Sequence, residues 1–439
     1  MKNTKTFIMS LCIAAAFMAG CGTIKTHTHN LAEEYCSCES KKEAQAKREC
    51  YLNSAKNGHD KAQYRVGQMY EFGNGTEKNA SEAEKWYKKA AEQGHARAEY
   101  RLGQIYEFGK GIAKNGAEAA EWYKKAAKQG HALSQRELGA MYEFGHGVEK
   151  DEAKAVKLYR KAAERNYGSA QYKMGQMYEL GKGVKKSKSE AIKWYKKTAE
   201  NVSDSHYAKE AEVKLRLLNS GYCQEQENWK ETINCYKEAA EQGNVESWLS
   251  AGDIYKLYAY RDIKMYAEAA KWYKKAAEQG NNIAQTILGD MCRFGNGVKK
   301  DEAEAAKWYR KAAEQGNANA QLALGEMYYY GNGMEKDKSE AAKWYREAAE
   351  QGHAKAQYNL GLCLDSENNK TEAAKWYMKA AEQGYQLAQY VLGRMYGKGR
   401  GVTQNQSEAI KWYKKAARNV PNSYYAEEAE ERLYCMKCR

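Results

Sequence analysis

The feature that most constrains this 439-residue chain is a unit of 36 residues, repeated along most of its length. Its clearest marker is a tryptophan followed by a tyrosine. This marker position recurs every 36 residues in two series, Trp86, Trp122, Leu158 and Trp194, then Trp272, Trp308 and Trp344. A fixed period of this length is typical of a solenoid of stacked helix pairs. Such solenoids present long surfaces to partners and rarely enclose a catalytic pocket, so the repeat favours a binding function.

Residues 60–94 show how one unit should fold. Apolar and small side chains recur at helical spacing over residues 62–70, which predicts a first helix, helix A, that ends at the glycines of residues 73–75. A second helix, helix B, should begin near Ser81, whose hydroxyl can cap it, and end at Gly94. The Gly-x-Gly element between the helices recurs along the chain. It is not a phosphate-binding loop, because no strand precedes it and no Gly-Lys-Ser/Thr follows it.

The motif of one unit reads Leu102-Gly103-x-x-Tyr106-x-x-Gly109-x-Gly111, then Ala119-x-x-Trp122-Tyr123-x-Lys125-Ala126-Ala127-x-Gln129-Gly130-His131. This motif resembles the Sel1-like repeat, a relative of the tetratricopeptide repeat, and the resemblance covers about residues 57–417. It implies an all-α chain, an α/α right-handed superhelical solenoid, here of about nine complete helix-pair repeats plus capping helices. Repeats of this family act as adaptors and assembly scaffolds, so the resemblance implies protein partners without identifying them.

The chain should contain two arrays. Residues 189–215 match residues 407–433, with 19 of 27 residues identical, and each copy carries an acidic amphipathic helix after a final helix B. A terminal repeat must cover apolar surface on one side only, which such a polar-backed helix can do. We therefore predict a first array in residues 31–220 and a second in residues 221–439, each with a capping helix.

The first residues should lie outside the repeats. Basic residues precede an apolar stretch at residues 7–19 that is too short for a membrane span, the layout of a secretory signal. Met18-Ala19-Gly20-Cys21 resembles a bacterial lipobox. That resemblance implies removal of a signal peptide, residues 1–20, lipid attachment at Cys21, typically with palmitate, and a short tether at residues 21–30.

Lipidation at Cys21 predicts an exported protein that is anchored to a membrane leaflet without crossing it. Gly22 stands where an inner-membrane retention signal typically has Asp. In a Gram-negative bacterium this favours the outer membrane, facing the periplasm or the cell surface.

The eleven cysteines fit an exported chain, in which disulfides can form. The start of each predicted array offers one pair: Cys36 or Cys38 with Cys50, and Cys223 with Cys235. Each pair would fasten a leading loop to the first helix B. Cys292 and Cys363 occupy helix-A positions, where we expect them to be buried as small apolar residues.

The chain carries a formal net charge of +14, with 71 Lys and Arg against 57 Asp and Glu. Much of the excess lies in basic pairs just after the Trp-Tyr marker, such as Lys88-Lys89 and Lys124-Lys125. Stacked repeats would align these pairs into ladders that could bind acidic envelope glycans or lipid headgroups. The alternative is ordinary helix solvation, because acids such as Glu84 lie one turn away. Nucleic acid is not expected as a partner of an anchored, exported protein.

In the tetratricopeptide-like architecture, the A helices line a concave groove. Exposed A-helix positions of the first array are therefore our candidate contacts for an extended peptide or a partner helix. They are Arg65, Arg101, Lys173, Gln68, Gln104 and Gln176.

No catalytic residues, metal ligands or cofactor are predicted. β-Lactam hydrolysis, attributed to some cysteine-rich relatives in this family, is an alternative, but the chain lacks Ser-x-x-Lys, Lys-Thr-Gly and Gly-x-Ser-x-Gly. Those relatives also carry paired cysteines inside each repeat, unlike this chain. Four histidines share one position after the Gly stop of helix B, where other repeats have Asn, so we expect a surface series with a role in helix entry: His59, His95, His131 and His353. We therefore predict a non-enzymatic, envelope-anchored scaffold for protein partners.

Overall fold

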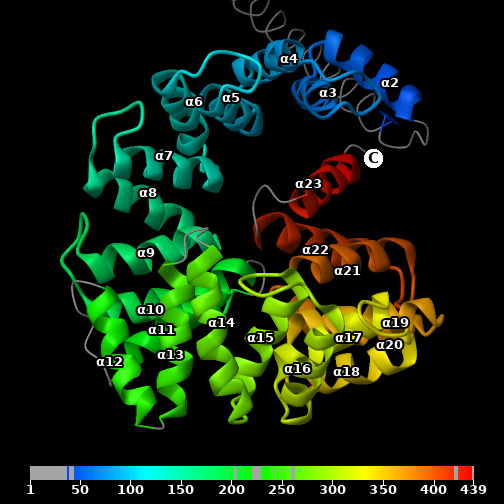
Figure 1. The fold of residues 1–439 in the computed structure, drawn as a ribbon. Coiled ribbons are helices and arrows are strands. Elements are labelled where there is room, and N and C mark those ends of the chain that lie inside the picture. Colours follow the sequence, from blue (N-terminus) through cyan, green and yellow to red (C-terminus); the bar gives the residue numbers. More distant parts are fainter. Residues whose placement is uncertain are drawn as a thin grey trace, which may run out of the picture. The chain divides into compact units, whose positions relative to one another are not determined.

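The computed structural model describes residues 37–38, 44–201, 205–219, 229–242, 244–258, 263–419 and 424–437. This described part is helical and contains no strand, which confirms the all-α prediction (Figure 1). None of its helices is both long and apolar enough to cross a bilayer.

Nine helix pairs follow the predicted A–B pattern within the described residues. Their A helices are α3 (Asp60–Phe72), α5 (Ala96–Phe108), α7 (Ala132–Phe144), α9 (Gly168–Leu180), α13 (Val245–Tyr258), α15 (Asn282–Phe294), α17 (Ala318–Tyr330), α19 (Ala354–Ser366) and α21 (Gln386–Lys398). Their B helices are α4 (Ala80–Glu92), α6 (Gly116–Lys128), α8 (Glu152–Glu164), α10 (Lys188–Ala199), α14 (Ile263–Glu278), α16 (Glu302–Glu314), α18 (Lys338–Glu350), α20 (Lys370–Glu382) and α22 (Gln406–Asn419). Most helices are 13 residues long, because the glycines recur at a fixed period.

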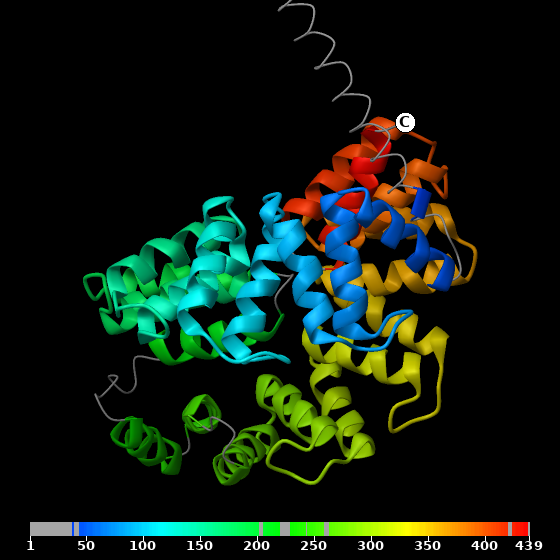
Figure 2. The same cartoon turned by 90° about the horizontal axis from the view of Figure 1, so that it is seen from above.

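Four further helices accompany the pairs: α2 (Ala44–Lys56), α11 (Ser205–Asn219), α12 (Trp229–Glu241) and α23 (Tyr424–Lys437). The chain forms two compact units. Unit 1 comprises residues 1–162 with residues 430–439, and unit 2 comprises residues 163–429. From α13 to α22, each helix of unit 2 packs against the next one in the chain (Figures 1 and 2). The predicted array boundary near residue 220 falls among residues outside the described part, so that division stays a prediction.

The contact that fixes each hairpin joins a glycine in helix A to the tyrosine of helix B. Tyr123 is fully buried, and a Cβ added to Gly103 would lie 2.4 Å from its ring. The same contact joins Gly289 to Tyr309 and recurs in the other hairpins. Only a residue without a side chain lets the helix-A backbone lie directly on the tyrosine ring, so each glycine–tyrosine pair sets the spacing between its two helices.

A buried glutamine in helix A ties most hairpins to the helix before them; α5 has Glu99 at this position and α13 has Trp248. Gln63 donates to the carbonyl of Ala55 at the end of α2 (3.1 Å) and accepts from Gln93 at the end of α4 (2.7 Å). The first bond satisfies a carbonyl at a helix end that has no partner within the helix, and the second joins two side-chain amides. The bond from the helix-A glutamine to a preceding helix recurs at Gln135, Gln171, Gln285, Gln321, Gln357 and Gln389.

The four histidines after the Gly stop begin A helices, as predicted. In each, the ring Nδ1 accepts from a backbone amide in the first turn, at 3.2 to 3.4 Å: His59, His95, His131 and His353. Asn281 and Asn317 cap α15 and α17 with their side-chain oxygens. The expected surface location is wrong for His59 and His131, which are buried: the ring of Tyr434 contacts His59, and the ring of Tyr100 in α5 contacts His131.

α11 covers the final hairpin of the predicted first array, as a capping helix should. Ala211 and Tyr207 lie against Tyr172 and Tyr195 of α9 and α10. The other side of α11 is also occupied, since its Arg216 binds α13. This helix therefore joins consecutive hairpins of unit 2 in addition to closing α10. The first half of α23 lies on α21 in the same way, with Tyr390 and Tyr425 in ring contact.

Candidate interaction surface

The buried tyrosine of each helix B needs an acceptor for its hydroxyl, because an unpaired buried hydroxyl is costly. In the first four hairpins the acceptor is a glutamate in the last turn of helix A, four residues after the helix-A glycine. The pairs are Tyr87–Glu71 (2.6 Å), Tyr123–Glu107 (2.6 Å), Tyr159–Glu143 (2.7 Å) and Tyr195–Glu179. Burial raises the pKa of Tyr123, so its hydroxyl stays protonated and donates to the carboxylate.

In α13 and α15 the carboxylate moves one turn toward the start of the helix. Tyr273 donates to Asp253 (2.8 Å) and Tyr309 donates to Asp290 (2.6 Å), and each aspartate follows the helix-A glycine directly. In α17 Glu326 has this position; burial and then the charge of Glu326 raise the pKa of Tyr345. Sequence reasoning missed these three acids. The sequence signal that could have revealed them is the residue after the helix-A glycine, which is Gln in most hairpins of the first array and Asp or Glu in these three.

Two predicted contacts, Arg65 and Gln68, belong to a network inside unit 1. Arg65 donates to Gln68 (2.8 Å), which donates to the hydroxyl of Tyr64 (2.9 Å). Arg65 also forms an ion pair with Glu431, and both side chains are largely buried. Arg65 is therefore engaged within its own unit, and its contact with a partner stays a prediction.

Arg101 and Gln104 repeat this arrangement one hairpin later. Arg101 donates to Gln104 (3.1 Å), and Gln104 donates to the hydroxyl of Tyr100 (2.9 Å). The guanidinium of Arg101 also lies 3.7 Å from Glu71 and above the ring of Phe72. Burial lowers the pKa of Arg101, but interactions with Tyr64 and Glu71 outweigh it, so the arginine stays charged.

The remaining predicted contacts, Lys173 and Gln176, are half-buried on α9. Beside them, Lys214 of α11 binds Glu179 at 2.6 Å, and both side chains of this pair are buried. The structure thus pairs Arg65 with Gln68 and Arg101 with Gln104, and a role in partner binding stays a prediction for all six residues.

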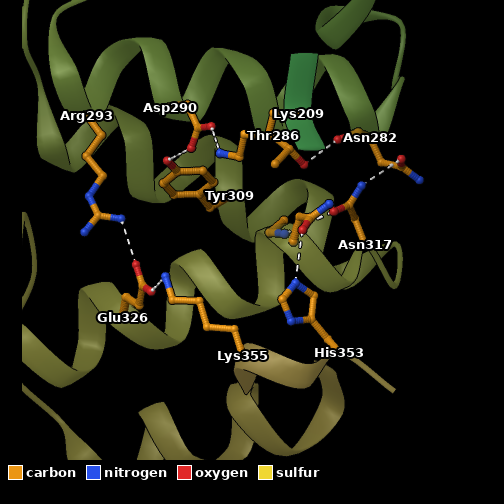
Figure 3. Close-up of polar contacts among 12 residues, drawn as sticks. Lys209, Asn282, Thr286, Asp290, Arg293, Tyr309, Asn317, Glu326, His353 and Lys355 are labelled. Carbon is orange, nitrogen blue, oxygen red and sulfur yellow. Dashed lines mark hydrogen bonds and ion pairs between the residues drawn. The ribbon is translucent and has the colours of Figure 1, made fainter. Parts of the chain in front are cut away.

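The A helices of unit 2 carry a more continuous polar network, shown in Figure 3. Lys209 of α11 reaches across to Asp290 of α15 (2.8 Å). Arg293 of α15 (3.3 Å) and Lys355 of α19 (2.7 Å) converge on Glu326 of α17. Three successive A helices are therefore linked by charged side chains that stay partly exposed.

Lys256 adds a cation of α13 to this surface, but no carboxylate of the described residues forms an ion pair with it. It stands four residues after the helix-A glycine, in the place that Arg293 has in α15. Arg216 takes the nearest carboxylate, Asp253, through two bonds of 2.8 and 2.9 Å. Within the described part of the chain, Lys256 has no ion pair, and burial lowers the pKa of its amine. The A-helix surface from α11 to α19 thus keeps one cation free for an anionic group.

In the basic pairs after the Trp-Tyr marker, the first and the second residue make different contacts. The second lysine of most pairs lies over the ring of the marker tryptophan, as Lys125 does over Trp122 at 3.8 Å. The first is close to an acid in α4, where Lys88 binds Glu84 (2.8 Å). These contacts agree with the helix-solvation alternative, although the lysines remain at the surface.

Among the predicted cysteine pairs, Cys50 forms a disulfide with Cys38, one of the two partners that the sequence left open. Cys235 is also disulfide-bonded. Cys21, Cys36 and Cys223 lie outside the described residues. Among the cysteines of the described residues, Cys292 and Cys363 are free and buried, as expected. No three His, Cys, Asp or Glu side chains of the described part are grouped so that they could hold a metal ion.

A family model described as the Sel1 repeat matches ten segments: residues 60–95, 96–131, 132–167, 168–202, 230–244, 261–281, 282–317, 318–353, 354–385 and 386–419. Among solved structures, a protective antigen of uropathogenic Escherichia coli is 34% identical over 89% of each chain, with a TM-score of 0.42. A Sel1 repeat protein from Oxalobacter formigenes is 26% identical over 79% of this chain and 89% of its own, with a TM-score of 0.39. Comparison with curated proteins yields no match.

Proposed function

Because this chain belongs to the Sel1 repeat family, whose helical arrays generally bind protein partners, we propose that it is an exported lipoprotein scaffold that assembles proteins of the cell envelope. One observation carries the binding part of this proposal. The A helices from α13 to α19 place charged groups at equivalent positions in successive hairpins, and these groups are linked to one another yet partly exposed. Such a surface can hold an extended segment of a partner through side chains spaced by the repeat.

The envelope part rests on the sequence. Residues 1–20 have the layout of a signal peptide, and the lipobox-like residues 18–21 offer Cys21 as the acyl acceptor. Acyl chains there would anchor the repeats to a leaflet, most simply the outer membrane of a Gram-negative cell.

A crosslinking experiment tests partner binding. A photoreactive residue at Leu362, which is 39% exposed on α19, should capture one or a few envelope proteins in cells. Charge reversal at Lys256 and Lys355 should reduce their recovery several-fold, because both cations lie on the A-helix surface. The matched control reverses the charge of Lys307, an exposed lysine on helix α16. Loss of recovery with the control alone, or no captured protein at all, would contradict the proposal.

The anchor has its own test. Cells grown with labelled palmitate should yield a labelled protein, and Cys21→Ser should abolish the label and release the protein from the membrane fraction. A labelled Cys21→Ser protein would rule out this cysteine as the acylation site.

Two alternatives are separable by simple measurements. Acidic-glycan binding by the basic pairs predicts a bound glycan that is released in about 0.5 M salt, where the Debye length is about 4 Å. β-Lactam hydrolysis predicts turnover of nitrocefin by the purified protein. A positive result in either assay, without a captured protein partner, would replace the scaffold proposal.

A further inference from the structure

Unit 1 exposes one phenylalanine at the same place in three consecutive hairpins. Phe72, Phe108 and Phe144 are the last residues of α3, α5 and α7, and their exposed fractions are 46%, 52% and 54%. We call these three residues the aromatic rim. Single exposed apolar residues are ordinary, but a large aromatic side chain repeated at the same exposed position suggests contact with something outside the protein.

The fold does not require an aromatic residue at this position. In unit 2 the equivalent residue is Lys398 in α21, and that helix still ends at a left-handed glycine, Gly399. Ser366 has the same place in α19, which ends at Glu367 without a left-handed glycine. Helix termination therefore does not depend on the aromatic ring. Arg101 lies over the ring of Phe72 and His146 stacks on Phe144, but all three rings keep about half of their surface exposed.

A lysine accompanies each member of the aromatic rim. The stem of Lys78 lies on Gly73, the glycine that follows Phe72, since a Cβ added there would be 3.0 Å from the lysine Cγ. Lys114 and Lys150 have the same relation to the glycines after Phe108 and Phe144. All three lysines are exposed. Unit 2 repeats the combination of an exposed apolar residue and a lysine at Leu180 with Lys186, Phe294 with Lys300, and Tyr330 with Lys336.

The loops that carry these lysines follow one edge of unit 1. A Cβ added to Gly111 would lie 2.2 Å from Ala80, at the start of the preceding helix B, and Gly147 has the same relation to Gly116. Each loop therefore rests on the hairpin before it, which keeps the three A–B loops at one end of the stack. Over these loops four lysines face three acids, a net charge of +1: Lys78, Lys110, Lys114 and Lys150 against Glu77, Glu149 and Asp151.

We propose that this edge of unit 1 binds the surface of an anionic phospholipid membrane. The loop lysines complement the negative headgroups, and the phenylalanine rings beside them can enter the interface between headgroups and acyl chains. A protein groove would have to supply an apolar pocket for every ring at the repeat spacing. A membrane offers a continuous surface that accepts all of them.

The length of the chain before the repeats supports this choice, in a step that rests on the proposed lipid anchor. Residues 22–36, fifteen in number, separate Cys21 from the first described residue, Ser37. They can span at most about 50 Å, so an anchored chain would hold unit 1 near the leaflet. At the resulting local concentration, even weak contacts by the rim would be occupied much of the time.

Vesicle binding tests the proposal without the anchor. The mature chain with Cys21→Ser should sediment with vesicles of phosphatidylglycerol and phosphatidylcholine and bind phosphatidylcholine alone much more weakly. Changing Phe72, Phe108 and Phe144 together to Ser should lower the partition coefficient about tenfold, and changing Lys78, Lys114 and Lys150 together to Gln should have a similar effect. The matched control, Gln at Lys85, Lys124 and Lys157 on the B helices of the same hairpins, should change binding at most about twofold.

Circular dichroism should show that all these variants keep the helical fold, because every changed side chain is exposed. Equal binding by the rim variant and its parent, or no binding to anionic vesicles, would overturn the proposal. So would a rim variant that binds vesicles normally but loses a crosslinked protein, which would make the rim a protein-binding surface. Palmitate labelling reports on the anchor independently, so failure of the lipoprotein proposal remains distinguishable from failure of this one.

Discussion

The first four hairpins and the hairpins that begin at α13 place the acceptor of the buried tyrosine hydroxyl at different positions of helix A. Both bury a helix-B tyrosine that needs an acceptor. In α3 to α9 the acceptor is a glutamate in the last turn of helix A, exemplified by Glu107, and cations such as Arg101 stand before the helix-A glycine. In α13 and α15 the acceptor follows the glycine directly, as Asp253 and Asp290 do, and a base such as Arg293 occupies the last turn.

This difference shows which part of the repeat the fold fixes and which part it leaves free. The tyrosine and the glycine beneath its ring keep their places in both regions. The carboxylate needs only to reach the hydroxyl, which it can do from either of two turns. Because the neighbouring cations move with it, the charge pattern on the A helices can change while the core stays the same.

The largest expected effect is the loss of stability when the acceptor carboxylate is replaced, and it should differ between the two regions. Asp253 is fully buried and binds both Tyr273 and Arg216. Asp253→Asn should therefore cost about 3 kcal/mol, because it leaves the largely buried arginine without its countercharge. Glu107→Gln, at a more exposed acceptor, should cost about 1 kcal/mol. Urea unfolding followed by circular dichroism measures both; equal costs would show that the two acceptor positions do not differ energetically.

The shared contact provides the next test. Gly103→Ala and Gly289→Ala would each place a methyl group within the ring contact of a buried tyrosine, so each should cost about 2 kcal/mol. Gly94→Ala is the matched control. Its backbone is left-handed (φ 80°) and open around the added Cβ, so it should show only the backbone penalty of about 1 kcal/mol. If Gly103→Ala and Gly289→Ala differ widely, the two regions do not share one core.

A pH experiment tests how a histidine cap of the first region differs from the asparagine caps of α15 and α17. The pKa of His95 is lowered to about 4, by burial first and then by Arg97 and Lys61, against a raising effect of Asp60. The unfolded chain therefore takes up the proton first, and the contribution of this cap is complete above about pH 6.5 and lost as the pH falls toward 4.

At pH 5 we expect a loss of about 2 kcal/mol relative to pH 7 from this one cap. His95→Asn, which copies the caps Asn281 and Asn317, should keep the stability at pH 7 and reduce the loss at pH 5. Urea unfolding of both proteins at the two pH values provides the measurement. An unchanged pH dependence in the variant would show that this cap does not contribute to acid sensitivity.

The smallest expected effect concerns Lys256. Its amine has no ion pair in the described part of the chain, and burial lowers its pKa. Lys256→Gln should change the free energy of unfolding by no more than about 0.5 kcal/mol, in either direction. A cost above about 2 kcal/mol would mean that this lysine serves the fold, and it would remove the argument that its charge is available to a partner.

The hairpins could be predicted from the sequence because their signals are local. The Trp-Tyr marker, the glycine stops and the helical spacing of small residues all lie within one 36-residue unit. The same holds for the histidines and asparagines that begin the A helices, such as His95 and Asn317. Their role as helix caps follows from their immediate neighbours, a glycine before each of them and helix A after it.

The candidate site was less predictable, because its contacts join residues that lie far apart in the chain. Lys209 and Asp290, separated by 81 residues, meet only because α11 packs beside the next hairpins. Arg65 was expected to face a partner, but it binds Glu431, 366 residues away. No period or motif predicts such pairs, since each depends on how whole helices are packed. The sequence could not decide whether Cys36 or Cys38 pairs with Cys50, because the two candidates are only two residues apart.

The buried glutamines have a consequence for how such a chain can change length. Gln383 still reaches Gln357 across a hairpin that is four residues shorter than its neighbours, with a separation of 26 residues where other hairpins have 30. Because each of these links lies within one hairpin or reaches only the helix before it, whatever the loop length, duplication of one complete unit also duplicates the glutamine bonds that hold it. Adding or removing whole units thus requires no compensating mutation, whereas a deletion inside a unit would separate a glutamine from its hydrogen-bond partner.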